Sequence, residues 1–195
     1  MTLTLIEATG HLVIAAMQGN AGAGGVFMAL AADEVWARDG MLLNPHYKNM
    51  GNLYGSEYWT YLLPRRLKVD TTIDQVMGRR LPMSAAQAQA AGLVDQVIEG
   101  DAPAFLAQAW ARGAALARAH GLATRLQAKH ATRQADEASK PLAAYRADEL
   151  ARLRRNFFGF DPSYHIARSN FVRRVPHSWT PRHLAVHRGA ASPRG

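Results

Sequence analysis

A glycine-rich turn between two apolar runs constrains this chain more than any other feature. The run "HLVIAAMQG" stops at Gly19, "NAGAGG" follows, and apolar residues resume at Val26. A buried strand of a parallel sheet is typically a short, continuous apolar run. The residues from Gly25 to about Val35 place apolar side chains at helical spacing. We therefore predict a strand, a glycine turn and a helix in direct succession, within an α/β fold.

The glycine turn is expected to bind negative charge. The first N–H groups of a helix have no partner within it, and the helix dipole places partial positive charge behind them. A phosphate group or the oxyanion of an activated carbonyl suits such a position. Phosphate loops normally carry a Lys and a Ser or Thr after the last glycine, whereas Val26 and Phe27 follow Gly25 here. An oxyanion is therefore favoured, and the alternative is that the glycines only allow close packing of helix on strand.

The remaining pattern predicts further short elements and a helical second half. Strands are predicted at 41–45 and 93–99, and helices at the end of 51–66 and over 69–78, 85–91, 102–120 and 142–157. Ser84 is a suitable N-cap and Gly92 a suitable C-cap for the helix between them. The polar stretch "KHATRQADEASK", residues 129–140, is interpreted as a linker.

The composition excludes several classes of protein. With 195 residues, 48% of them hydrophobic, the chain can bury the core of one compact domain. It has no cysteine, which excludes disulfides and thiolate chemistry. The first residues lack the basic segment of a signal peptide, and no apolar stretch reaches the roughly 18 to 20 residues of a membrane helix. We expect a cytoplasmic protein that does not enter a membrane.

Much of the formal net charge of +8 lies toward the C-terminus, in "ELARLRRNFFGF" and "NFVRRVPHSWTPRHLAVHR". This pattern favours a solvated basic tail, and a surface for a phosphate-bearing ligand or an acidic partner is the main alternative. Nucleic acid is not expected as a partner, because no RNP-like aromatic pattern, helix-turn-helix spacing or zinc-ligand spacing accompanies the charge. No pair of His or carboxylate residues has metal-ligand spacing, so no metal site is predicted.

Two separated segments resemble the crotonase, or enoyl-CoA hydratase/isomerase, superfamily. "HLVIAAMQGNAGAGGVFMALAADEVWA" is similar to its central segment and "RRLPMSAAQAQAAGLVDQVI" to a later one, in the same order and spacing. The resemblance implies that the glycine turn forms half of an oxyanion hole for acyl-CoA thioesters. It also implies a partial crotonase-like ββα spiral core at 1–100, an α-helical region at 101–175 and a basic, disordered tail at 176–195.

Three segments narrow the resemblance to the HoxX family of hydrogenase maturation factors: "AMQGNAGAGG", "LNPHYKNMGNLYGSEYWTYLLPRR" and "KPLAAYRADELARLRRNFFGFDPSYHIARSNFV". Full-length members of that family join a formyl-tetrahydrofolate-using domain to a crotonase-like domain. The resemblance implies a lyase that converts formyl-CoA to CO and coenzyme A for the nickel-iron hydrogenase ligand. The folate domain is absent from this chain. Two alternatives follow: a truncated fragment, or one piece of a split protein with an N-terminal partner fragment and contacts with hydrogenase maturation proteins. In either case we expect no activity of the chain alone.

The resemblance also implies roles for individual residues. Gly24 falls where the superfamily places the second backbone N–H of its oxyanion hole. Phe27 and Tyr47 stand where hydratases carry two catalytic carboxylates, so enoyl-CoA hydration should be absent, because it needs a positioned base and acid. The residues expected to line the substrate are Ala23, Gly25, Phe27 and Asn44.

Release of CO from a formyl thioester requires a proton to move from carbon to sulfur. Tyr47, whose phenol can donate and accept, is the first candidate for this shuttle, and Glu57 in "GSEYW" is the second. A packing role for Tyr47 and a capping or solvent-facing role for Glu57 remain open. Two other functions also remain: a generic enoyl-CoA hydratase or isomerase, and an inactive fragment that acts as a binding module.

Overall fold

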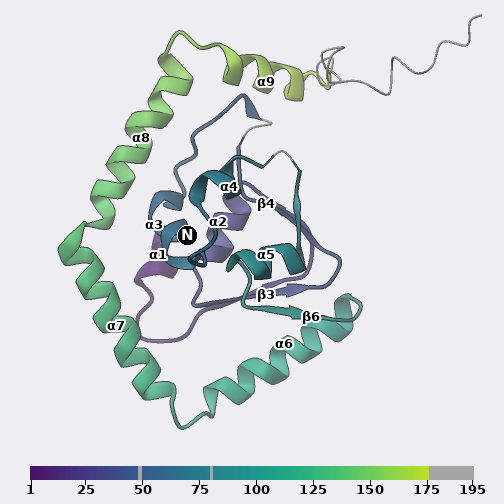
Figure 1. The fold of residues 1–195 in the computed structure, drawn as a ribbon, viewed down its shortest axis with the longest axis vertical. Coiled ribbons are helices and arrows are strands. Elements are labelled where there is room, and N and C mark those ends of the chain that lie inside the picture. The colour runs from purple at the N-terminus through teal and green to yellow at the C-terminus, as the bar shows by residue number, and fades with distance from the viewer. Residues whose placement is uncertain (48–49, 80, 176–195) are drawn as a thin grey trace, which may run out of the picture.

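Long helices in the second half of the chain surround a core of short strands and helices (Figure 1). The computed structural model describes residues 1–47, 50–79 and 81–175. The core is formed by residues 14–98, and the surrounding helices begin at Ala102. The fold is α/β with a helical C-terminal region, as predicted, while the predicted tail at 176–195 lies outside the described residues.

The strand predicted before the glycine turn is the edge of a parallel sheet. It forms β1 (Ile14–Met17), which pairs with β3 (Glu34–Arg38), and β3 pairs in turn with β6 (Gln96–Ile98). Residues 35–37 in the central strand are at most 1% exposed. A parallel strand covered on both faces needs a continuous apolar run, which is what the sequence provides here.

A second sheet holds the residues on either side of the glycine turn. Here β2 (Ala21–Gly22) runs parallel to β4 (Leu42–Asn44), and β4 runs antiparallel to β5 (Met83–Ser84). The turn leads directly into α2 (Gly24–Leu30). The predicted strands at 41–45 and 93–99 are confirmed, as β4 and β6.

The helix after the turn is shorter than predicted. It ends at Leu30, and Val35, which the helical pattern included, belongs to the central strand β3. The Asp33 backbone N–H donates to the Val13 carbonyl at 2.8 Å, and the Asp33 carboxylate accepts from the Val13 N–H at 2.7 Å. These bonds turn the chain into the sheet, so tertiary pairing overrides the local helical pattern.

The short helices around the core begin and end at the residues expected of caps. The Ser84 hydroxyl accepts from the Gln87 N–H, while the Gln87 side chain accepts from the Ser84 N–H, which is a capping box. Thr72 and Gln75 form the same arrangement. Gly92 closes its helix with a left-handed φ of 89°. The helices in this part are α3 (Trp59–Arg66), α4 (Ile73–Met77) and α5 (Ala85–Ala91).

The core consists of two apolar clusters. The larger joins α2, α3 and α5 to the two sheets, with Phe27, Leu43 and Leu63 fully buried. The smaller lies between the parallel sheet and the first long helix, and consists of Trp36, Ile98, Phe105 and Ala109. Burial of apolar surface at these two places is the main force that holds the helices on the sheets.

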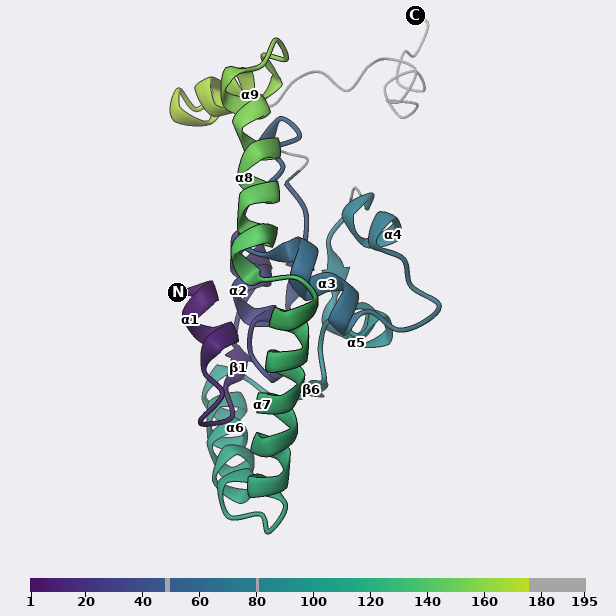
Figure 2. The same cartoon turned by 90° about the vertical axis from the view of Figure 1, so that its left-hand side faces the viewer.

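Four helices follow the core and line up around it. In Figure 1 they run in chain order from the bottom along one side to the top, and Figure 2 shows them edge-on as one column. None of the helices in residues 1–47, 50–79 and 81–175 has the length and apolar character needed to cross a bilayer. The bounds are α6 (Ala102–Ala117), α7 (Leu122–Ser139), α8 (Leu142–Phe158) and α9 (Ser163–Val172), and α1 (Thr2–Glu7) precedes the core.

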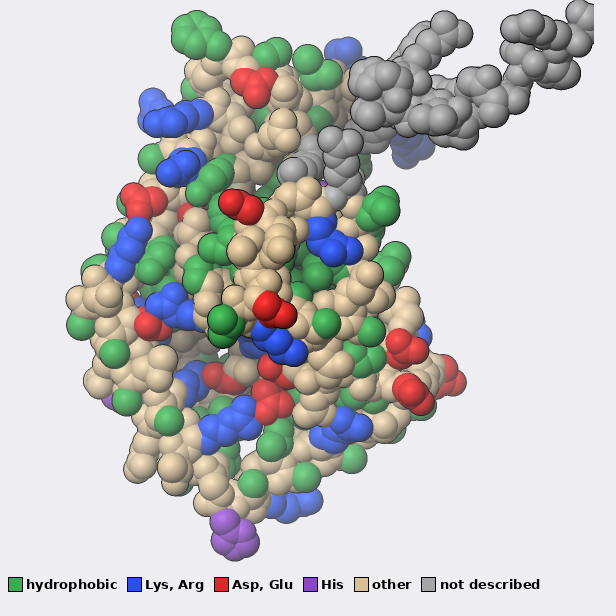
Figure 3. Space-filling view, in the orientation of Figure 1, with side chains coloured by type: hydrophobic (Ala, Val, Ile, Leu, Met, Phe, Trp, Pro, Cys, Tyr) green, Lys and Arg blue, Asp and Glu red, His purple; other side chains and the backbone are tan. Residues whose placement is uncertain are grey.

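The linker prediction for residues 129–140 is wrong, because this stretch belongs to α7. Polar residues recur along one face of α7 and bind the core: Arg125 pairs with Glu34, and Lys129 with Asp33, each at 2.6 Å. Charged side chains gather around the hollow between α7 and the core (Figure 3). A largely polar helix can form when such ion pairs hold it, and these pairs cannot be seen in the pattern of hydrophobic residues.

Candidate active site

The glycine turn leaves two backbone donors without a partner. Ala23 adopts φ 48° and ψ −123°, a conformation that residues with a side chain rarely adopt, and its N–H donates to the Asn44 carbonyl at 2.8 Å. The Ala23 carbonyl accepts from the Val26 N–H at 3.0 Å. Among the described residues, neither the Gly24 nor the Gly25 N–H has a hydrogen-bond partner. Within the described part of the chain, the strained turn therefore presents two unpaired donors at the start of α2.

The Glu57 carboxylate lies directly against this turn. A methyl group added at Gly24 would lie 3.2 Å from Glu57 Oε1, which is closer than ordinary van der Waals contact. The other carboxylate oxygen, Oε2, accepts from the Tyr47 hydroxyl and from the Ser56 N–H, the latter at 2.9 Å. One oxygen of Glu57 is thus held by hydrogen bonds, and the other faces the glycine turn.

Tyr47 is buried in an aromatic cluster, and only 5% of it is exposed. Its ring stacks on Phe27 with a centroid distance of 5.8 Å, and Phe27 lies 6.4 Å from Trp59. Gly55 packs so closely that a Cβ there would lie 2.3 Å from the Tyr47 ring, and its φ of 81° also favours glycine. Burial, and then the hydrogen bond to Glu57, raise the pKa of Tyr47 far above its usual value. Tyr47 therefore stays protonated and donates to Glu57.

Two cavities open beside the turn. One, of about 460 Å³, is lined by Ser56, Glu57, Tyr58 and Arg146 together with residues 1–3. The other, of about 310 Å³, runs along β1 and α2 and includes Gly25. Met1 lines both cavities. Glu57 thus lines one of these cavities and Gly25 the other.

The structure brings together most of the residues that the sequence singled out. Gly24 meets Glu57, and Glu57 meets Tyr47, although 10 residues separate that last pair in the chain. Asn44 holds the turn through its backbone, while its buried Oδ1 has no partner in the described part of the chain. No carboxylate stands at position 27 or 47, yet Glu57 supplies one at the same site. The assignment of Tyr47 as first candidate and Glu57 as second stays a prediction.

Sequence reasoning missed the residues of α8 that hold the Glu57 loop. Glu149 is fully buried, and its carboxylate accepts from the Tyr58 N–H at 2.9 Å, the Thr60 N–H at 2.9 Å and the Thr60 hydroxyl at 2.7 Å. Arg146, one turn earlier, donates to the Ser56 carbonyl. Arg146 and Glu149 lie three residues apart, on one face of α8, and this spacing was the only available sign of their role. Charges at this spacing are usual on solvent-facing helices, so it did not single them out.

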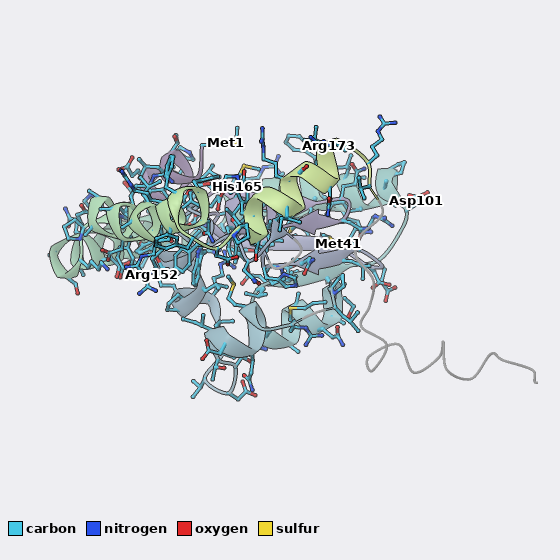
Figure 4. All side chains as sticks on the ribbon, turned by 90° about the horizontal axis from the view of Figure 1, so that it is seen from above. Met1, Met41, Asp101, Arg152, His165 and Arg173 are labelled. Carbon is cyan, nitrogen blue, oxygen red and sulfur yellow. The ribbon has the colours of Figure 1, made fainter. Side chains whose placement is uncertain are left out.

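Figure 4 labels His165 and Arg173 on α9, and Arg152 at the edge of the molecule on α8. His165 Nε2 lies 2.9 Å from the Phe157 carbonyl oxygen. Within residues 1–47, 50–79 and 81–175, no group of three or more His, Asp or Glu residues is arranged to hold a metal ion.

The chain is similar to known proteins of one family. The family model for enoyl-CoA hydratase/isomerase matches residues 2–158. The hydrogenase maturation factor HoxX of Bradyrhizobium diazoefficiens is 55% identical over 191 residues, which are 97% of this chain and 33% of HoxX. The chain therefore spans about one third of the length of that relative.

Solved structures show the same relationship. HypX from Aquifex aeolicus, crystallised in complex with tetrahydrofolic acid, superposes with a TM-score of 0.87 at 43% identity, over 96% of this chain and 33% of HypX. An enoyl-CoA hydratase/isomerase from Pseudoalteromonas atlantica superposes with a TM-score of 0.72 at 19% identity, over 91% of this chain and 68% of that one. At 19% identity the second likeness shows the fold alone.

Proposed function

The chain belongs to the enoyl-CoA hydratase/isomerase family, and from that membership we propose that it splits formyl-CoA into carbon monoxide and coenzyme A. The observation that carries the proposal is the Glu57 carboxylate, which has one oxygen against Gly24 and the other bonded to Tyr47. The similarity to a hydrogenase maturation factor supports the choice of a formyl thioester over other acyl groups.

The reaction needs only a proton transfer and a bond cleavage. The formyl carbon loses its proton, the carbon–sulfur bond breaks, and the electron pair of that bond leaves with sulfur. The proton then joins sulfur, so that H–CO–S–CoA becomes CO and HS–CoA with no oxidant or reductant. A basic group beside the formyl carbon and a donor near the thioester oxygen are the parts that the protein must provide.

The residues at the turn can fill these roles. The N–H groups of Gly24 and Gly25, which have no partner among the described residues, would donate to the thioester oxygen and hold the formyl carbon beside Glu57. Glu57 Oε1 faces the same turn and would take the formyl proton and pass it to sulfur. Tyr47 would hold Glu57 in place through Oε2 rather than act as the base, because its raised pKa keeps the phenol protonated.

The aromatic cluster would protect the reaction from water. Hydrolysis of formyl-CoA to formate is the side reaction that such a site must avoid. Phe27 is fully buried, and Tyr47 and Trp59 are at most 9% exposed, so this side of Glu57 is dry. A water-poor site also strengthens the hydrogen bonds that hold the thioester oxygen in place.

Steps before and after this reaction would involve other proteins or other domains. We assign no folate chemistry to this chain and propose that any formyl-tetrahydrofolate reaction takes place in the other two thirds of HoxX-like proteins. Hydrogenase maturation proteins would then receive the carbon monoxide, in the cytoplasm.

Asn44 and Ala23 would contribute to the site through the shape of the glycine turn, since the Asn44 backbone carbonyl accepts from the Ala23 N–H.

The test is CO release from formyl-CoA, trapped by haemoglobin, beside a formate assay. Because the chain matches one third of HoxX, it is assayed alone and as a chimera that replaces the matching third of the Bradyrhizobium protein. Glu57→Gln removes the base and should lower the rate of CO release by at least about 100-fold. Tyr47→Phe keeps the ring but frees Glu57 Oε2, and should lower it by about tenfold.

Two glycine variants serve as a matched pair. Gly24→Ala places a methyl group 3.2 Å from Glu57 Oε1 and should slow CO release, whereas Gly113→Ala in α6 meets nothing within 4 Å and should not. Hydration of crotonyl-CoA is the competing activity, because Glu57 supplies one of the two groups that it needs. Hydration without CO release, or full CO release by Glu57→Gln, would refute the proposal.

A further inference from the structure

We propose that Glu149 and Arg146 of α8 are positioning residues, which fix the Glu57 carboxylate against the glycine turn. Neither side chain touches the Gly24 turn or Tyr47 in the described structure; both act on the backbone of the loop that carries Glu57. The inference deepens the proposed function, because it gives Glu57 its orientation, and it rests on that function for its catalytic consequence.

The first step of the argument is that α3 lacks a cap of its own. Its N-cap residue is Tyr58, in the left-handed region at φ 61°, and no side chain of the preceding loop bonds to its first N–H groups. The Glu149 carboxylate instead accepts from the Tyr58 and Thr60 N–H groups, and it lies 91 and 89 residues after them in the chain. A carboxylate at a helix N-terminus suits the positive end of the helix dipole.

The second step is that α8 holds both neighbours of Glu57. The residue before it, Ser56, receives a hydrogen bond from Arg146 at its carbonyl, and the residue after it, Tyr58, donates its N–H to Glu149. Farther along the loop, the Tyr54 N–H donates to Asn156 Oδ1 at 3.0 Å. With the backbone fixed on both sides, the Glu57 side chain leaves the loop in one direction only.

The third step is the contrast with the other helix caps. Ser84, Thr72 and Asp101 each cap a helix with a side chain that lies three residues from its partner. A local cap stabilises one helix end and nothing else, and it needs no buried charge. Glu149 is 0% exposed, and burial of a carboxylate is costly unless its bonds are complete. A cap by Glu149 therefore fixes α8 to the loop that carries Glu57.

The negative charge of Glu149 also favours the hydrogen bond from Tyr47 to Glu57. Its negative charge adds to that of Glu57 and to burial in raising the pKa of Tyr47, so the phenol stays protonated and bonded to Glu57. Geometry and charge thus both favour one arrangement of the Tyr47–Glu57 pair.

The experiment follows the Tyr47 phenol by NMR in the 195-residue chain labelled with ¹³C at tyrosine Cζ. The chain has six tyrosines, and Tyr47→Phe assigns the resonance. Glu57→Gln shows where the Tyr47 resonance lies when its hydrogen bond to the Glu57 carboxylate is disturbed. Glu149→Gln keeps the shape but replaces one acceptor oxygen with a donor, so at least one backbone N–H loses its partner. We expect it to move the Tyr47 resonance in the same direction as Glu57→Gln.

Thr60→Val is the matched control. It removes the hydroxyl bond to Glu149 but keeps both backbone bonds, so the Tyr47 resonance should stay in place. If Glu149→Gln fails to fold, Arg146→Met releases the Ser56 carbonyl without disturbing the buried carboxylate, and it should also move the resonance. A folded Glu149→Gln, or in its place a folded Arg146→Met, with the wild-type Tyr47 resonance overturns the inference.

Activity separates this inference from the proposed function. In the CO-release assay we expect Glu149→Gln to lower kcat by about tenfold with little change in KM, because a displaced base slows the chemical step more than binding. If the Tyr47 resonance moves but Glu57→Gln retains full activity, the positioning role stands and the catalytic role of Glu57 fails.

Discussion

Helices α7 and α8 have similar lengths and similarly polar sequences, but they are attached to the core in opposite ways. α7 (Leu122–Ser139) has no buried residue and is held by ion pairs that are partly open to solvent, such as Asp136 with Arg65, whose side chains are 20% and 34% exposed. α8 (Leu142–Phe158) buries Leu142 and Glu149, and the latter carboxylate accepts three hydrogen bonds.

The difference shows that polarity alone does not say what a helix contributes. Exposed ion pairs are weak, are screened by salt and tolerate small shifts in position. A buried carboxylate with its bonds complete is intolerant of displacement, because any lost bond leaves a buried polar group unsatisfied. The partly exposed pairs of α7 therefore tolerate small shifts, whereas the buried carboxylate of α8 defines the position of the Glu57 loop.

The largest effect on stability is expected at the buried contact of α8. Glu149→Leu leaves the Tyr58 and Thr60 N–H groups without an acceptor in the interior. We expect the free energy of unfolding in urea to fall by about 3 kcal/mol, since each buried unsatisfied group costs about 1 to 3 kcal/mol. A loss below about 1 kcal/mol would mean that water replaces the carboxylate and that the two helices are attached alike.

A smaller effect is expected at Asp136 on α7, which pairs with Arg65 at 2.7 Å and accepts from the Tyr61 hydroxyl at 2.9 Å. Asp136→Asn keeps an acceptor for Tyr61 but loses the charge. We expect a loss of about 0.5 kcal/mol at neutral pH, and less in high salt, because the pair is partly exposed. Urea unfolding at two salt concentrations measures it, and a loss that salt leaves unchanged would contradict this description of α7.

The same pair predicts a dependence on pH. The hydrogen bond from Arg65 lowers the pKa of Asp136 below its ordinary value of 3.8. A depressed pKa in the folded state adds stability above the unfolded value, and this stability is lost as the pH falls through the folded pKa. The difference between wild type and Asp136→Asn should therefore be constant above about pH 5 and shrink below about pH 4. A difference that grows in acid would reverse the assigned sign.

The smallest effect is expected at Lys140, between the two helices, which pairs with Asp148 at 2.6 Å. The side chains are 41% and 65% exposed, so the pair is open to water and salt. Lys140→Ala should leave the urea midpoint unchanged within error. A measurable shift would show that exposed pairs on α8 also matter, and would weaken the contrast with its buried carboxylate.

Much of the core could be predicted because its signals are local. The apolar run of β1, the capping residue Ser84 and the left-handed Gly92 each depend on neighbours within a few residues. Predictions were wrong where distant contacts decide the outcome. Val35 lies in a strand because β3 pairs on both sides, and residues 129–140 form a helix because their charges meet the core.

The sequence by itself determined the glycine turn, the family and the presence of Tyr47 and Glu57 in one aromatic-rich segment. These features lie in short stretches whose order along the chain is enough to identify them. Only the tertiary structure decided that Glu57 lies against Gly24. It also decided that Glu149 binds the Tyr58 N–H, in the loop that carries Glu57, although 91 residues separate Tyr58 and Glu149 in the chain. The physical reason is that a hydrogen bond between distant residues leaves no periodic or local trace in a sequence, since it exists only once the helices have packed.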